Sequence, residues 1–273
     1  MTTSAAQSTP KVPPPVSPAA SVVILRDGAA GIETFMLVRQ EGSGMAFSGA
    51  FVFPGGKVDK ADGTAAWSVH APATPEIPER SFWIAAIRET FEEAGLLLAR
   101  TQGGGPLIDA KTAHKIVMAE RKSRVGGLDT PFIDLVAAHR LTLAVDQMIH
   151  FGHWITPAWA PRRFDTHFFL VAAPVTQAGH FDEGESQEGL WIRPADALAE
   201  ADAGKRTLVP VTRFSLALLA SWGSVEEAVS AARKRPIVTV MPKMEKKPDG
   251  RILRIPPEAG YLTSEIFMPE PRS

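Results

Sequence analysis

Short apolar runs bounded by turn residues alternate along this chain with longer stretches of helical periodicity. Short apolar runs indicate strands, whereas apolar residues that recur every three or four positions indicate helices. The predicted strands cover residues 22–25, 34–38, 51–53, 153–155, 166–172 and 190–192, with a hairpin within residues 236–255. The predicted helices cover residues 79–94, 113–121, 132–139, 194–199, 211–219 and 225–232. Because the two kinds of element mix without a regular rhythm, the pattern predicts the α+β class.

The helix predicted over residues 79–94 has one acidic face and one apolar face. Glu92 and Glu93 follow Glu89 by three and four positions. At about 3.6 residues per turn, the three carboxylates share one side of the helix. The apolar positions fall near the opposite side, at Ile84, Ile87, Phe91, Ala94 and Leu98. Gly95 stands where the C-terminus of a helix favours glycine.

This acidic face is a candidate metal site. Neighbouring carboxylates repel one another, and a bound multivalent cation would reverse that repulsion. Hard oxygen ligands favour Mg²⁺ or Mn²⁺, and Mg²⁺ commonly links carboxylates to a substrate phosphate. A solvated acidic face, with Arg88 as a local ion-pair partner, is the alternative. Gly55 and Gly56 precede the helix and would let an anion approach the backbone, which favours a phosphate site.

A known motif covers the same helix. Residues 88–96 resemble the second half of the Nudix box, G-x5-E-x7-R-E-U-x-E-E-x-G-U, in which U is apolar, with Thr90 at the first U. Gly56 resembles the opening glycine, but 32 positions separate it from the box arginine instead of 14, as if 18 residues were inserted. Arg80 stands where the box places its first glutamate. Glu79, one position away, is the predicted substitute.

The interrupted box resembles one Nudix subgroup, which includes the mammalian peroxisomal coenzyme A diphosphatase and carries such an insertion. The similarity covers roughly residues 20–230. It implies a Nudix-type α/β/α sandwich with a mixed β-sheet, an inserted helical segment, and a C-terminal helical and hairpin extension. It also implies Mg²⁺-dependent hydrolysis of a phosphoanhydride bond, with Mn²⁺ as the alternative ion. Coenzyme A or acyl-CoA would yield 4′-phosphopantetheine and adenosine 3′,5′-bisphosphate.

The resemblance also implies roles for individual residues. Glu92 and Glu93 would bind the metal, and Glu89 would bind it or polarise the attacking water. Nudix enzymes often add a glutamate from a later loop, and here Glu185 is the first choice and Glu188 the second. The expected phosphate contacts or orienting residues are Gly55, Gly56, Arg39 and Arg88.

Other candidate residues have more ordinary interpretations. His150, His153 and His167 lie near one another in sequence, but no carboxylate stands at metal-ligand spacing, so structural roles are favoured. Trp154 and Trp159 could stack on an adenine, although core packing is the commoner role of tryptophan. Arg162 and Arg163 could contact phosphates, and pairing with Asp165 is the alternative for Arg163.

The predicted organisation is one Nudix domain with two insertions and two flanking segments. Its parts are a disordered leader at residues 1–19, the domain at residues 20–235, an insertion in the box at residues 57–78, a helical insertion at residues 105–147, and an extension at residues 236–273. The leader is rich in Ala, Ser, Thr and Pro, which bury little surface.

The amino-acid composition excludes several classes of function. The formal net charge of −1 excludes a general polyanion binder, so no nucleic-acid partner is expected. The absence of cysteine excludes disulfides and thiolate metal sites. With no secretory signal or membrane span, the cytoplasm is the expected location.

The expected partner is a small nucleotide-diphosphate substrate, and whether the protein forms a homodimer stays open. The rival functions are hydrolysis of ADP-ribose, NADH or another nucleoside diphosphate conjugate, and a Nudix-fold sensor that binds a nucleotide without cleaving it.

Overall fold

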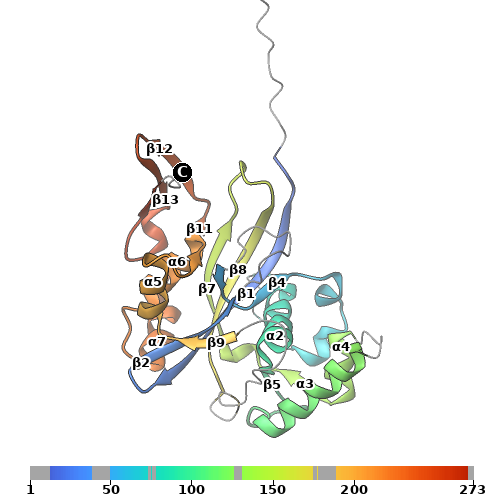
Figure 1. The fold of residues 1–273 in the computed structure, drawn as a ribbon. Helices are drawn as coiled ribbons and strands as arrows, with labels where there is room; N and C mark the ends of the chain where they lie inside the picture. The colour runs from blue at the N-terminus through green and yellow to red at the C-terminus, as the bar shows by residue number, and fades with distance from the viewer. Residues whose placement is uncertain are drawn as a thin grey trace, which may run out of the picture.

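Two groups of helices enclose a central mixed sheet in this computed structural model (Figure 1). The structure describes residues 13–38, 50–72, 75, 78–125, 131–174, 177 and 189–269. The main path of the sheet runs in the order β10 (Thr207–Leu208), β3 (Ala50–Val52), β2 (Gly31–Val38), β1 (Val16–Gly28), β8 (Arg163–Ala172), β7 (Met148–Ile155) and β11 (Thr239–Val240). Two short strands lie off this path, since β4 (Gly55–Lys57) pairs with β1 and β9 (Gly189–Ile192) pairs with β2.

Strand β1 is longer than its apolar run predicted. The run at residues 22–25 forms its centre, but the strand begins at Val16, which pairs with Arg163 of β8 in a parallel register. Residues 16–19, which were expected in the disordered leader, therefore lie in the sheet. Backbone hydrogen bonds to β8 order this part of the strand, and such long-range pairing leaves little mark on the local sequence.

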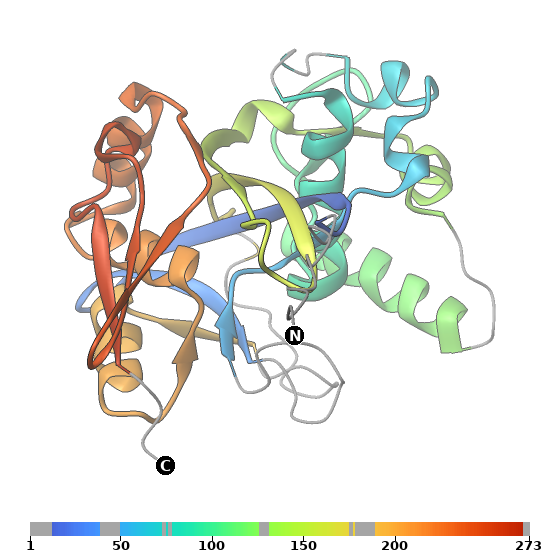
Figure 2. The ribbon, with the colours of Figure 1, turned by 90° about the horizontal axis from the view of Figure 1, so that it is seen from above.

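Side chains of β1 alternate between two hydrophobic cores. Val22 and Ile24 belong to the core shared with α2 (Arg80–Ala94). Val23 and Leu25 belong to the core on the other face, which is covered by α5 (Pro194–Asp202), α6 (Pro210–Leu219) and α7 (Val225–Lys234). The view from above shows the sheet between these two groups of helices (Figure 2). The α/β/α sandwich with a mixed sheet confirms the predicted fold class.

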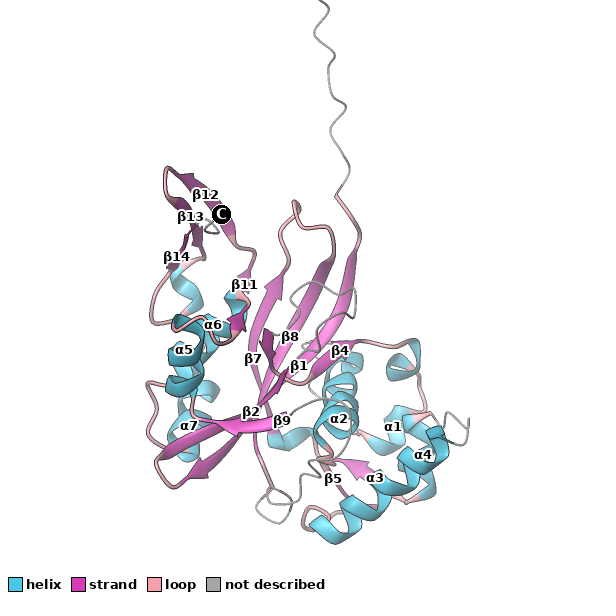
Figure 3. Cartoon of the chain, viewed as in Figure 1, coloured by secondary structure: helices cyan, strands magenta, loops and turns pink. Residues whose placement is uncertain are grey.

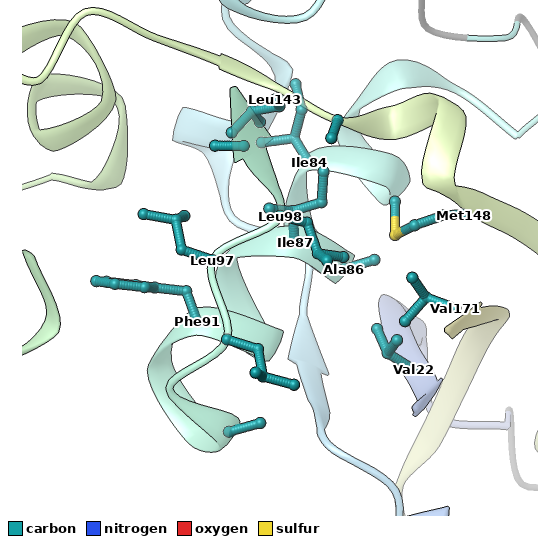
Figure 4. Packing of buried hydrophobic residues seen from close by; sticks show 14 of the residues in the cluster. Val22, Ile84, Ala86, Ile87, Phe91, Leu97, Leu98, Leu143, Met148 and Val171 are labelled. Atoms are coloured by element: carbon teal, nitrogen blue, oxygen red, sulfur yellow. The ribbon is translucent and has the colours of Figure 1, made fainter. Parts of the chain in front are cut away.

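The apolar face of α2 is the centre of the first core. Ile84 and Ile87 are fully buried, and Figure 4 shows them with Phe91 among side chains of the following segment and of β8. Thr90, which stands where the box has an apolar residue, is also fully buried. Its Oγ1 donates a hydrogen bond to the Ala86 carbonyl at 2.8 Å. The hydroxyl is therefore satisfied within the helix, and the departure from the motif does not disturb the core.

Seven further elements extend this side of the sheet (Figure 3). They are η1 (Lys60–Gly63), α1 (Trp67–His70), β5 (Ala99–Thr101), α3 (Ala110–Val125), α4 (Phe132–Ala138), β6 (Leu141–Leu143) and η2 (Val145–Gln147). The ring of Trp67, from the insertion at residues 57–78, packs 5.8 Å from that of Phe132 in α4. The two insertions thus share one core. Each predicted helix is confirmed, and none of the described helices has the length and apolar character of a bilayer span.

A small antiparallel sheet forms the C-terminal extension. It consists of β12 (Lys243–Lys247), β13 (Gly250–Arg254) and β14 (Glu265–Pro269), with η3 (Pro257–Ala259) between the last two strands. The predicted hairpin is confirmed, because Lys247 pairs with Gly250 across its turn. Strand β14 was not predicted. The Trp154 Nε1–H donates to the Tyr261 hydroxyl at 2.8 Å, which ties the extension to β7.

Candidate active site

The acidic face of α2 lies at the edge of the buried helix. Glu89 is 8% exposed, while Glu92 and Glu93 are half-buried. Gly95 ends the helix with φ 64°, in the left-handed region that favours glycine, as predicted. The structure therefore places the three predicted glutamates on one side of α2, with Glu89 buried and Glu92 and Glu93 half-buried.

The glycine turn packs directly against these glutamates. The Gly55 N–H donates to Glu93 Oε2 at 2.7 Å. A Cβ on Gly55 would lie 2.4 Å from the Ala20 carbonyl oxygen, and a Cβ on Gly56 would lie 2.4 Å from Glu89 Oε1. No other residue type fits at either position without a shift of backbone or carboxylate. The glycine turn and the acidic helix therefore lie in direct contact, while the phosphate contact expected of the two glycines stays a prediction.

Arg88 links the carboxylates. Its Nη1 donates to Glu89 Oε1 at 2.7 Å and to Glu92 Oε2 at 3.1 Å. On its other side, Nε and Nη2 donate to the two carboxylate oxygens of Asp62 at 3.1 and 3.0 Å, and Nη2 also donates to the Lys57 carbonyl at 2.9 Å. The Arg88 side chain is 8% exposed, so its donors bind the carboxylates rather than water. These contacts fix the side chains of Glu89 and Glu92. The orienting role expected for Arg88 matches this geometry.

Asp62 was missed by the sequence analysis, and Glu79 was the wrong substitute for the first glutamate of the box. Asp62 lies six residues after Gly56, which is the G-x5-E spacing, with aspartate in place of glutamate. Its side chain is almost fully buried against Arg88 and accepts the Asp59 N–H at 2.8 Å. Glu79 is exposed and its side chain does not cap α2. The 18-residue insertion thus follows Asp62, and counting forward from Gly56 would have found this residue.

The ionisation of the cluster follows from burial and shared charge. Burial lowers the pKa of Arg88, but the hydrogen bond to Asp62 and the charges of Glu89, Asp62 and Glu92 outweigh it and raise the pKa above its usual value. Burial raises the pKa of Glu89 and outweighs the lowering effect of Arg88. Glu89, Glu92 and Glu93 together offer the hard oxygens and the negative charge that suit a divalent cation, and Arg88 offsets only part of that charge.

Three predicted residues cannot be placed. Arg39, Glu185 and Glu188 lie outside the described residues. Gly189, the first described residue after Glu188, pairs with Leu37 of β2.

The aromatic and arginine candidates lie away from the glutamates. Trp154 is 6% exposed and packs in the core opposite α2, as the ordinary interpretation held. Trp159 is 61% exposed. Arg163 donates to the carbonyls of Thr156 and Pro14, whereas Asp165 is bound by His153. Arg163 therefore binds backbone carbonyls of the β7–β8 turn and of the segment before β1 in place of Asp165.

Known proteins are similar to this chain in sequence. The model of the NUDT19 Nudix domain matches residues 70–218, more than half of the chain. Putative nudix hydrolase 7 of Caenorhabditis elegans is 33% identical over 168 residues, which are 62% of this chain and 49% of that protein. Human acyl-coenzyme A diphosphatase NUDT19 is 26% identical over 282 residues, covering 88% of this chain and 75% of the human protein. This chain thus spans about half the length of the worm relative and three quarters of the human one.

A solved structure supports the same family. The crystal structure of a Nudix hydrolase from Alicyclobacillus acidocaldarius superposes with a TM-score of 0.63 at 26% identity, covering 79% of this chain and 96% of that one. The family match spans α2 and therefore includes the glutamates and their arginine. The chain accordingly belongs to the Nudix hydrolase family and carries a Nudix domain of the NUDT19 type.

Proposed function

We propose that this protein is a Mg²⁺-dependent diphosphatase that cleaves the phosphoanhydride bond of coenzyme A or its acyl esters. The products would be 4′-phosphopantetheine, or its acyl form, and adenosine 3′,5′-bisphosphate. The observation that carries the proposal is the joint placement of Glu89, Glu92 and Glu93 beside the Gly55–Gly56 turn, with Arg88 fixing two of the carboxylates.

We assign the glutamates separate roles according to their positions and exposure. Glu92 and Glu93 are more exposed than Glu89 and would hold the cation. When bound, the cation neutralises phosphate oxygens and lowers the pKa of a water. Glu89 completes the ligand set or accepts the proton of the attacking water, and its raised pKa makes it a stronger proton acceptor than an exposed carboxylate. Glu185 remains the proposed additional glutamate, with Glu188 as the second choice.

The substrate class rests on the relatives. The proteins from human, chicken and Xenopus laevis that align over 73–88% of this chain are each named acyl-coenzyme A diphosphatase NUDT19. The insertion after Asp62 interrupts the Nudix box, as in the subgroup of the coenzyme A diphosphatase that this chain resembles in sequence. Coenzyme A and acyl-CoA are therefore preferred to ADP-ribose and NADH.

A substrate panel tests the proposal. The protein is incubated with Mg²⁺ and, separately, with coenzyme A, an acyl-CoA, ADP-ribose and NADH, and the products are identified by mass spectrometry. We expect coenzyme A or acyl-CoA to be cleaved fastest, with adenosine 3′,5′-bisphosphate as a product. No substrate should be cleaved once the metal ion is removed by a chelator. Faster cleavage of ADP-ribose or NADH would reassign the substrate. Nucleotide binding without any cleavage would favour the sensor.

A further inference from the structure

A second set of metal-ligating side chains meets on strands β7 and β8. One ring nitrogen of His153, one of His167 and a carboxylate oxygen of Asp165 lie within 4.8 Å of one another. His153 pairs with His167 across the two strands, and Asp165 stands two residues before His167, so it points to the same face. The sequence favoured structural roles for the histidines because no carboxylate stood at metal-ligand spacing. Asp165 supplies that carboxylate from the same strand as His167, and the pairing of β7 with β8 adds His153.

Hydrogen bonds hold both imidazole rings through Nδ1. His153 Nδ1 lies 2.8 Å from Thr239 Oγ1, and His167 Nδ1 lies 2.9 Å from His150 Nε2. Metal-bound histidines usually have their second ring nitrogen held in this way, because the bond fixes the tautomer and the direction of the free nitrogen. Nε2 of each ring is therefore the nitrogen that would bind a cation, which on the His153 ring would replace the proton shared with Asp165. His153 Nε2 lies 2.5 Å from Asp165 Oδ1.

The cluster has a closed side and an open side. The ring of Phe82, from α2, packs edge-on against His167 with centroids 4.4 Å apart. The side chain of Asp165 is 35% exposed, while that of His153 is 16% exposed. An ion can therefore enter past the carboxylate and keep a water ligand, while the imidazoles stay partly shielded from solvent.

This cluster is separate from the glutamates of α2. Ala20 of β1 pairs with Gly56 of β4 on one side and with His167 of β8 on the other. Two strand spacings, about 10 Å, thus separate His167 from the glycine turn. An ion at the histidines would not share ligands with an ion at the glutamates.

We propose that His153, Asp165 and His167 bind one divalent transition-metal ion, with Zn²⁺ as the best match. Two imidazoles and a carboxylate are a ligand set that zinc sites use with water in the fourth position, and imidazole suits zinc far better than magnesium. Bond lengths of 2.0–2.2 Å place two ligand atoms of a tetrahedral ion about 3.4 Å apart. The Asp165 carboxylate therefore withdraws by about 1 Å from His153 Nε2. The two rings, now stacked at 4.0 Å, turn so that their Nε2 atoms converge.

Metal titration of the full chain tests this site. After treatment with a chelator, Zn²⁺ is added in the presence of excess Mg²⁺ and a chromophoric zinc competitor. We expect one Zn²⁺ ion per protein molecule to bind tightly enough to compete with the dye. Asp165→Asn and His153→Ala should each weaken binding by at least about tenfold. His114→Ala changes an exposed histidine on α3 and is the matched control. Substitution by Co²⁺ gives a visible spectrum, which reports on the nitrogen and oxygen ligands independently of activity.

The outcomes separate this site from the glutamates. Glu93→Gln should keep the tight equivalent of zinc. The proposal is wrong if the wild-type protein binds no zinc, if Asp165→Asn and His153→Ala bind it as tightly as wild type, or if Glu93→Gln alone abolishes binding. Circular dichroism shows whether each variant folds, and Asp165→Asn keeps the shape of the side chain, so a loss of binding there reports on ligation.

Discussion

At the scale of single residues, one buried guanidinium organises the site. Arg88 donates to carboxylates from η1 and from its own helix, so it fixes both the helix and the segment that precedes the insertion. The glutamates could be predicted from their helical spacing. Asp62 could not be predicted by counting back from Arg88, because the 18 inserted residues separate it from the rest of the box.

Asp62→Ala should destabilise the protein far more than Glu79→Ala. Removing the Asp62 carboxylate leaves Arg88 partly unpaired in a buried site, which typically costs about 3–5 kcal/mol. Glu79 is exposed, so its removal should change the free energy of unfolding by about 0.5 kcal/mol or less. Urea unfolding of both variants measures the difference. Equal stabilities would show that Asp62 does not hold the box arginine.

The histidines of β7 and β8 should make the metal-free protein sensitive to acid. Burial, together with repulsion from His153, lowers the pKa of His150 to about 4 and that of His167 to about 3, and His150 adds repulsion on His167. Since the unfolded chain takes up protons near pH 6.5 and the folded imidazoles do not, stability should fall as the pH falls from about 6.5 toward 4.

Urea midpoints with a chelator present, measured from about pH 7 to about pH 5, test this expectation. His150→Gln should lose less stability over this range than wild type, because one of the two depressed groups is gone. His114→Gln, an exposed histidine on α3, should behave as wild type. An unchanged pH dependence in His150→Gln would contradict the assignment.

At the scale of elements, the periodic helices and the apolar strands were predicted, whereas the two-residue strands at the two ends of the sheet were not. Helix α2 could be predicted from its local sequence alone, because its buried and acidic positions repeat with the period of a helix. Strands β10 and β11 have two residues each and exist through pairing with β3 and β7. The sequence therefore predicted the helix that carries the glutamates, but not the edges of the sheet or the strand pairing that brings His153 to Asp165 and His167.

The packing of β4 against α2 gives an element-scale prediction. Gly56→Ala would place a Cβ 2.4 Å from Glu89 Oε1, and the carboxylate, held by Arg88, would have to move. A displacement of about 1 Å in a catalytic site can lower the rate by about a hundredfold. Gly63→Ala is the matched control, since its Cβ would meet Ser81 at 3.9 Å, an ordinary contact. Diphosphatase rates of the two variants test this, and similar rates would contradict the close packing.

At the scale of the whole molecule, the C-terminal extension is part of the domain's packing. Tyr261 accepts the hydrogen bond of Trp154, and Arg235 at the end of α7 donates to the Ala259 carbonyl. Leu253 and Ile255 are buried in the same core as α6 and α7. Residues far apart in sequence thus share one core, so the extension should unfold together with the sheet.

Tyr261→Phe should lower the free energy of unfolding of the whole protein by about 1–3 kcal/mol, because the Trp154 Nε1–H loses its acceptor in a buried site. Leu262→Ala, at a position 62% exposed, should have little effect. Thermal unfolding followed by tryptophan fluorescence and by circular dichroism should give one coincident transition in each variant. Two separate transitions would show that the extension is an independent unit.

The most direct test of the metal-dependent diphosphatase is Glu93→Gln. Glutamine can still accept the Gly55 N–H that Glu93 accepts at 2.7 Å, so the turn and the helix stay together while the negative charge is removed. Hydrolysis of coenzyme A with Mg²⁺ should fall by several orders of magnitude in this variant. It should be unchanged in Glu258→Gln, an exposed glutamate of η3. A Glu93→Gln protein that cleaves coenzyme A at the wild-type rate would contradict the assignment of the active site.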